Sequence, residues 1–199
     1  NPTIEQNNIT VSNGWTTQKE IVVSGTENFC SSVKLTLKDS EGNTYLKDAA
    51  TQVTNNQWRY AFRPDIEADE AGKEFTITVT DNLGNKAEKT FIVQKTDRKA
   101  PTMTSAVETS KTWTKEKTFT FTATDEGSGD VSIGIDNANA YVPASKQGTT
   151  YSRAYTFTEE IYGSKAIKIY FKDGLGNIAV KDFTIHNIDT TKPTITKYE

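Results

Sequence analysis

The sequence predicts an all-β protein made of two antiparallel β-sandwiches in tandem. Three observations lead to this fold class: composition, an alternation of apolar residues, and an internal repeat. The 199 residues include 32 Thr, 26 Ile plus Val and only 5 Leu. Side chains branched at Cβ favour a pleated, half-solvated surface, whereas a chain so poor in Leu is a weak candidate for a helical bundle.

Apolar and polar residues alternate along much of the chain. Phe75, Ile77 and Val79, for example, are separated by single Thr residues. A period of two places one set of side chains in the core and the other in solvent, which is the signature of a half-buried strand. With a short strand at the start of each unit, we expect six or seven strands per unit. The other apolar residues expected to point inward are Ile21, Val23, Leu35, Leu37, Trp58, Tyr60, Phe62, Phe91, Val93, Phe119, Phe121, Ile133, Ile135, Tyr155, Phe157, Ile167, Ile169, Phe171, Phe183 and Ile185.

The chain also repeats itself. Residues 96–104 (TDRKAPTMT) return as residues 188–196 (IDTTKPTIT), offset by 92 positions (189 − 97), and Pro2 opens a third Pro-Thr-apolar marker. Repetition at a fixed period indicates a structural module that occurs in tandem copies. We therefore predict one domain at 1–98, a second at 99–190, and the start of a further linker or repeat at 191–199.

Turn signals fall at matching places in the two units. Residues 81–85 (DNLGN) and 173–177 (DGLGN) share the offset of 92 (173 − 81). Asp accepts hydrogen bonds from its own backbone and Gly tolerates a positive φ, so each sequence predicts a tight hairpin. Residues 40–43 (SEGN) predict another hairpin by the same reasoning. In the acidic stretch 64–72 we expect a short helical turn.

The two units differ in length in their middle. Trp15 and Trp113 are equivalent at an offset of 98 (113 − 15), and the offset then falls to 92. Unit one therefore carries about six extra residues, which we expect in loops because loops absorb insertions cheaply.

Composition argues against several functional classes. The net charge is −3, so no basic excess is present to bind the phosphates of a nucleic acid. One His and one Cys are too few to build a zinc site, a Cys–His nucleophile pair or a His-based triad, so we expect no enzyme. No apolar run is long enough for a bilayer span, and we expect no membrane insertion in this fragment.

The chain resembles the bacterial immunoglobulin-like repeats of cell-surface proteins, especially Gram-positive adhesins and wall-attached stalks. Residues 189–194 (DTTKPT), 173–177 (DGLGN) and 125–129 (DEGSG) carry the likeness, which covers both units. It implies two tandem immunoglobulin-like sandwiches. Val23 and Ile77 stand where vertebrate immunoglobulin domains would place paired cysteines, so that disulfide is not expected here.

The resemblance implies a non-catalytic spacer or stalk in a secreted, cell-surface or cell-wall-attached bacterial protein. The chain would be a monomer within a tandem array and would contribute to adhesion to an unidentified host or glycan ligand. The alternative is a carbohydrate- or protein-binding accessory module of a secreted surface enzyme. Trp15 and Trp113 could stack on sugar rings in that case, although equivalent positions in two modules also suit a structural role.

Acidic residues suggest one candidate metal site. In an immunoglobulin-like sandwich, the loop at 125–130 and the turn at 173–177 would both face the linker. Asp97, Asp125, Asp130 and Asp173 could then converge on a calcium ion, which prefers hard oxygen ligands. No cofactor is required by this reasoning. The plainer alternative is that Asp125 and Asp173 cap their turns while the other carboxylates are solvated.

Unit one has a weaker version of the same arrangement. Glu27 and Asp81 occupy matching places, but no Asp-rich loop accompanies them. We expect Cys30 to lie near the start of a strand as a small hydrophobic residue.

Overall fold

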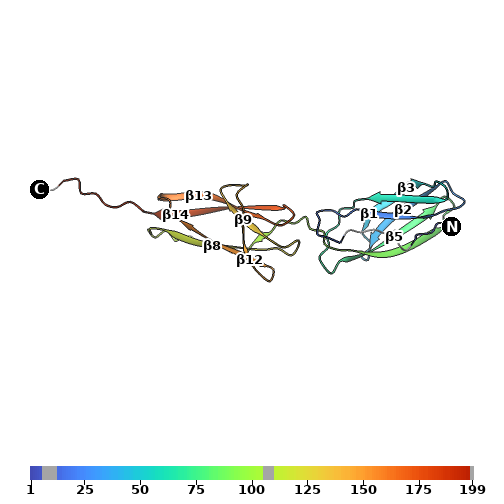
Figure 1. The fold of residues 1–199 in the computed structure, drawn as a ribbon, viewed down its shortest axis with the longest axis horizontal. Helices are drawn as coiled ribbons and strands as arrows, with labels where there is room; N and C mark the ends of the chain where they lie inside the picture. The colour runs from blue at the N-terminus through green and yellow to red at the C-terminus, as the bar shows by residue number, and fades with distance from the viewer. Residues whose placement is uncertain (6–12, 105–109, 198–199) are drawn as a thin grey trace. The chain divides into compact units, whose positions relative to one another are not determined.

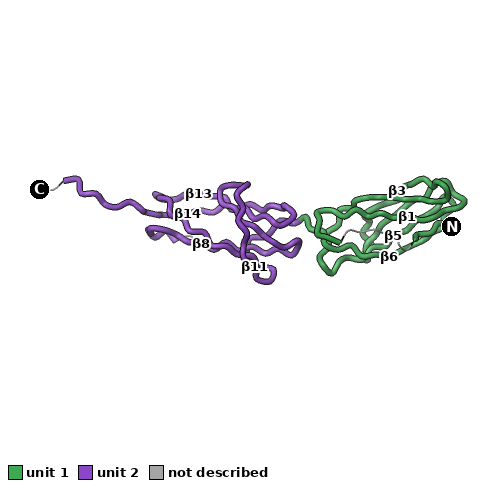
Figure 2. Tube along the Cα trace, viewed as in Figure 1, with its two compact units in different colours: residues 1–98 green, residues 99–199 purple. Residues whose placement is uncertain are grey.

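The computed structural model describes residues 1–5, 13–104 and 110–197. The chain divides into two compact units, Asn1–Arg98 and Lys99–Glu199 (Figure 2). The described residues form 14 strands and no helix, which confirms the all-β prediction. Accordingly, this part of the chain contains no helix of the length and apolarity that a membrane span needs.

Unit 1 consists of two layers of antiparallel strands. One layer pairs β1 with β4, and the N-terminal segment extends it because the Thr3 N–H donates to the Thr26 carbonyl at 2.9 Å. The other layer has the order β3-β2-β5-β6. The strand bounds are Ile21–Thr26 (β1), Ser32–Asp39 (β2), Thr44–Gln52 (β3), Gln57–Phe62 (β4), Lys73–Asp81 (β5) and Lys86–Val93 (β6).

Unit 2 repeats this topology. Its sheets have the orders β11-β12-β8-β7 and β10-β9-β13-β14, so β7-β8-β12 matches the N-terminal segment with β1 and β4. Figure 1 shows β8 and the β13–β14 pair in separate layers. The strand bounds are Thr102–Met103 (β7), Lys117–Thr124 (β8), Ser132–Ile135 (β9), Val142–Pro143 (β10), Ser145–Gln147 (β11), Thr150–Phe157 (β12), Ile161–Lys172 (β13) and Ile178–Ile188 (β14).

A separate hydrophobic core lies between the two layers of each unit. Every residue expected to point inward is either buried in its core or packed against it. Trp58 is buried, while Tyr60 and Phe62 pack at the edge of the same cluster. The strict alternation of β5, buried at every second residue from Phe75 to Asp81, is the plainest case.

The length difference between the units falls in their middle, as the sequence predicts, but a strand takes up part of it. Strand β3 has nine residues, whereas its counterpart β10 has two. A longer edge strand accommodates extra residues without changing the order of the strands in the sheet.

The prediction of a short helical turn at residues 64–72 is wrong. The stretch contains no helix: Pro64 and Ile66 are buried with an exposed residue between them, which is the alternation of a strand, and a bend follows at residues 70–71. Ala68 and Thr96 exchange backbone hydrogen bonds of 3.2 and 2.8 Å. Burial of Ile66 and pairing with the end of the unit therefore outweigh the turn-like composition of the segment.

The structure buries two lysines that the sequence did not predict to be buried. Lys19 and Lys117 are equivalent at the offset of 98 (117 − 19), and both are buried. Their Nζ atoms donate to the carbonyl oxygens of Gly14 and Ser110. Burial, with the nearby charge of Lys95, lowers the pKa of Lys19. Each ammonium thus holds, by a hydrogen bond, the segment that precedes β1 in unit 1 or β8 in unit 2.

Gly25 allows the N-terminal segment to lie against β1. A Cβ at Gly25 would come within 1.8 Å of the Thr3 carbonyl oxygen and 2.7 Å of Trp58 Cζ2. We expect Gly25→Ala to lower the free energy of unfolding of unit 1 by about 2 kcal/mol in urea denaturation, because backbone must move. Gly14→Ala is the matched control, since among the described residues no heavy atom other than those of its chain neighbours lies within 4 Å of its added Cβ. Equal destabilisation by the two variants would contradict this account.

Candidate metal centre

The chain enters each unit at one end of the sandwich, which we call the leading end. In unit 1, Thr3 pairs there with Thr26 at the end of β1, and in unit 2 Thr102 pairs with Thr124 at the end of β8. The turn between the last two strands of the unit lies at the same end, because β5 and β13 finish there beside β2 and β9.

An Asp carboxylate organises that turn in each unit. Asp81 Oδ1 accepts the N–H groups of Leu83 and Asn85 at 2.8 and 2.9 Å, and Oδ2 accepts Asn85 Nδ2 at 2.8 Å. Around Asp173 the three equivalent contacts measure 2.8, 2.9 and 2.7 Å. The hydrogen bond from the Asn85 side chain, joined by those from the backbone, lowers the pKa of Asp81 although burial opposes the shift. Asp81 and Asp173 therefore both cap their turns, as the two turn sequences predict.

The same arrangement occurs a third time in the hairpin turn predicted at residues 40–43, where Asp39 provides a cap that the sequence analysis did not assign. Its carboxylate accepts the backbone and side-chain N–H groups of Asn43, and Lys73 Nζ lies 2.9 Å from Oδ2. Burial by itself would raise the pKa of Asp39, but hydrogen bonds from Asn43, Lys73 and Tyr45 lower it well below its usual range. The signal was present in the sequence, since an Asp stands four positions before an Asn in all three turns.

In unit 2 the structure brings Asp125 and Asp173 together. Both are buried, and a carboxylate oxygen of each lies within 4.8 Å of the other. Their loops touch, because a Cβ added at Gly174 would be 3.2 Å from the Gly129 carbonyl oxygen. Asp125 and Asp173 are therefore the two predicted calcium ligands that lie buried within unit 2.

Asp130 and Asp97 are placed differently. Asp130 is exposed, at the end of its loop, and has a positive φ of 61°. Asp97 is buried and belongs to unit 1, where its N–H donates to the Thr16 carbonyl at 3.1 Å. Participation of these two residues in a calcium site stays a prediction.

Unit 1 holds the equivalent pair. Glu27 and Asp81 are buried, and a carboxylate oxygen of each lies within 4.8 Å of the other. The Cys30 Sγ lies within the same distance of both. Cys30 is half-buried just before β2, so it does not act simply as a core residue.

Two buried carboxylates this close repel each other unless protons, hydrogen bonds or a cation compensate their charges. Carboxylate and backbone carbonyl oxygens are the ligands that calcium takes in proteins, usually six to eight in number. Asp125 and Asp173 would supply two of them in unit 2, with loop carbonyls and water completing the shell.

No protein-family model matches the chain, and no curated protein matches it. Similar solved structures include dimeric latent PorU from Porphyromonas gingivalis, at 15% identity and a TM-score of 0.34 over 90% of this chain and 23% of that one. The FN1–FN3 domains of chicken CNTN1 match at 12% identity and a TM-score of 0.40, over 94% of this chain and 66% of that one. The BSP domain of a biofilm-associated protein matches at 15% identity and a TM-score of 0.28, over 94% of this chain and 30% of that one.

The chain spans about a quarter of the PorU chain that it matches, 23% of its length. The identities are low and the TM-scores are below 0.5, so the fold assignment rests on the strand order in each unit. In unit 1, with the N-terminal segment counted as the first strand, one layer contains the first, second and fifth strands, and in the other layer the sixth strand lies between the third and the seventh. The described residues of unit 2 form eight strands rather than the expected six or seven, because the short β11 pairs with the edge of β12; the other seven strands follow the same order. Both units are immunoglobulin-like sandwiches.

Calcium is expected to stabilise unit 2 through the Asp125–Asp173 pair. Millimolar calcium should raise the midpoint of thermal unfolding of this unit by about 5 °C relative to a chelator, because an ion that binds only the folded state stabilises it. Asp125→Asn should abolish the shift. Asp182→Asn, at an exposed carboxylate on β14, should retain it. Identical melting curves with calcium and chelator would contradict calcium binding.

Proposed function

We propose that this chain forms two spacer repeats of a secreted or surface-attached bacterial protein, and that these repeats contribute to adhesion. The observation that carries the proposal is the path of the chain through each unit. In unit 2 the chain enters beside Thr124, at the end of β8, and leaves beside Thr114, which precedes β8. The chain therefore enters each sandwich at one end and leaves it at the opposite end.

The exit of each unit is fastened by a parallel backbone pairing. In unit 1, the Thr16 N–H donates to the Lys95 carbonyl at 3.1 Å, and the Asp97 N–H donates back to Thr16. In unit 2, Thr114 exchanges the same two hydrogen bonds with Asn187 and Asp189, at 3.3 and 2.9 Å. Tension along the chain would load these bonds together, so each unit is suited to transmit force.

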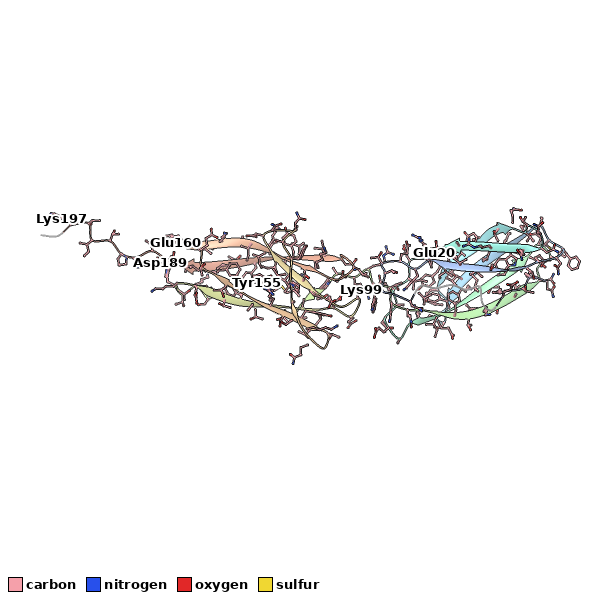
Figure 3. All side chains as sticks on the ribbon, in the orientation of Figure 1. Glu20, Lys99, Tyr155, Glu160, Asp189 and Lys197 are labelled. Carbon is pink, nitrogen blue, oxygen red and sulfur yellow. The ribbon has the colours of Figure 1, made fainter. Side chains whose placement is uncertain are left out.

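Side chains add to the fastening at the exit of unit 2. Figure 3 labels Glu160 and Asp189 at this end of the unit. Glu160 accepts hydrogen bonds from the hydroxyls of Thr190 and Thr191, and Asp189 accepts the Thr191 N–H at 2.9 Å. These contacts hold the first residues that follow the last strand.

Single-molecule stretching of the whole chain tests the spacer role. We expect two unfolding peaks, each releasing about 30 nm of chain, because each unit contains roughly 90 residues of at most 3.6 Å. Thr114→Pro removes the N–H that donates to Asn187, so one peak should move to lower force. The unmodified unit 1 is the internal control. Extension without resolved peaks would contradict the proposal.

A second candidate function, carbohydrate binding, is favoured by one exposed aromatic pair. The Trp113 side chain is 48% exposed and Tyr162 is 90% exposed, with ring centroids 5.3 Å apart. Trp15, the equivalent of Trp113 in unit 1, is half-buried and so offers less of its ring to a ligand. Large exposed aromatic rings offer an apolar face for stacking against a sugar.

A glycan array with the whole chain separates this candidate from a spacer role alone. If the pair binds a sugar, Trp113→Ala and Tyr162→Ala should each reduce the signal at least about tenfold, which corresponds to about 1.4 kcal/mol. Phe29→Ala is the matched control, since Phe29 is an exposed aromatic residue of unit 1. Absence of any bound glycan, or equal loss with Phe29→Ala, would rule the candidate out.

A further inference from the structure

We propose that the leading end of unit 1 binds a thiophilic divalent cation, of the chemistry of Zn²⁺, through Glu27, Cys30 and Asp81. This inference goes beyond the spacer role and does not depend on it. It also departs from the sequence expectation that one Cys and one His are too few for a zinc site, because two carboxylates provide the other ligands.

The geometry suits a small cation. One potential ligand atom from each of the three residues lies within 4.8 Å of the others. Ligand atoms around a tetrahedral zinc ion, at 2.0–2.3 Å from the metal, are separated by about 3.5 Å. Small side-chain rotations therefore suffice to close the three ligands on one ion. Carboxylate oxygen and thiolate sulfur both belong to the normal ligand set of zinc, and water commonly provides the fourth ligand.

A buried oxygen points independently to a missing ligand. The Glu27 side chain is fully buried. Its Oε1 accepts the Phe29 N–H at 2.8 Å, whereas its Oε2 is buried without any hydrogen bond from the described residues. The amino group of Asn1 lies 3.7 Å from Oε2, which is an ion-pair distance but too long for a hydrogen bond. A buried charged oxygen without a hydrogen bond is costly, and a coordinated cation would remove that cost.

The other two residues can bind without disturbing the fold. Asp81 Oδ2 accepts one hydrogen bond, from Asn85 Nδ2, so a lone pair remains for a cation while the turn stays capped. Cys30 is half-buried, so the ion can reach its sulfur from solvent. On binding, the thiol loses its proton to water and the thiolate forms the metal–sulfur bond.

Unit 2 provides an internal contrast. Counting by the offset of 98, Ser128 stands where unit 1 has Cys30 (128 − 30), and Asp125 stands where unit 1 has Glu27. Unit 2 therefore offers only oxygen at the three positions, which suits calcium, whereas unit 1 offers one sulfur, which suits softer metals. The two leading ends are expected to differ in metal preference because Ser128 replaces the sulfur of Cys30 with oxygen.

The test follows the reaction of Cys30 with a thiol reagent in the whole, reduced chain. We expect saturating Zn²⁺ to slow the reaction at least about tenfold, whereas Ca²⁺ at the same concentration leaves the rate unchanged. Glu27→Gln should abolish the protection. Glu20→Gln is the matched control, since Glu20 is an exposed carboxylate in the same unit, and it should keep full protection. A rate unaffected by Zn²⁺, or equal protection in Glu27→Gln, would overturn the proposal.

A second measurement covers the case in which Glu27→Gln fails to fold. Titration of the unmodified chain with Cd²⁺ should produce an ultraviolet thiolate-to-metal absorption band that saturates at one ion per chain and is absent in Cys30→Ser. Excess Ca²⁺ should not suppress the band, whereas Zn²⁺ should. Failure of the band to appear, or saturation only at several ions per chain, would contradict a built site.

Discussion

The carboxylate at the centre of each Asp-x-Leu-Gly-Asn turn is the interaction on which the rest of each unit depends. Asp81 and Asp173 each take up two backbone N–H groups and one side-chain N–H group within five residues. The turn fixes the register of the last two strands, and a slip of one residue would move every side chain to the opposite face. The pairing of Phe75 with Phe91, which keeps Phe75 in the core, depends on that register.

The same carboxylates also shape the leading end of each unit. Because the Asp must face its own turn, it lies beside the loop that joins β1 and β2 in unit 1, or β8 and β9 in unit 2. A second acid on that loop, Glu27 in unit 1 and Asp125 in unit 2, then lies within 4.8 Å of it. The opposite end carries different features, namely the buried lysines, the Trp positions and the parallel exit pairing. A repeat organised in this way separates a candidate ion-binding end from the end that fastens the exiting chain.

The strands and both cores follow from the sequence because the period-two pattern and the 92-residue offset are local and redundant. Three features do not follow. Residues 64–72 have the composition of a turn, but burial of Ile66 and pairing of Ala68 with Thr96 extend them, and both are tertiary effects. Lys19 and Lys117 resemble surface lysines in sequence, and only the folded loop provides the carbonyl that each ammonium reaches. Cys30 joins Glu27 and Asp81 through chain folding that no spacing reveals.

The central claim is that the chain consists of two self-contained repeats, each with its own core. Amide NMR spectra of residues 1–98, of residues 99–199 and of the whole chain test it most directly. The account predicts that each fragment gives a dispersed spectrum of a folded domain, and that the two spectra add up to that of the whole chain outside the immediate vicinity of residue 98. A collapsed, undispersed spectrum from either fragment would contradict it, since that unit would then depend on the other to fold.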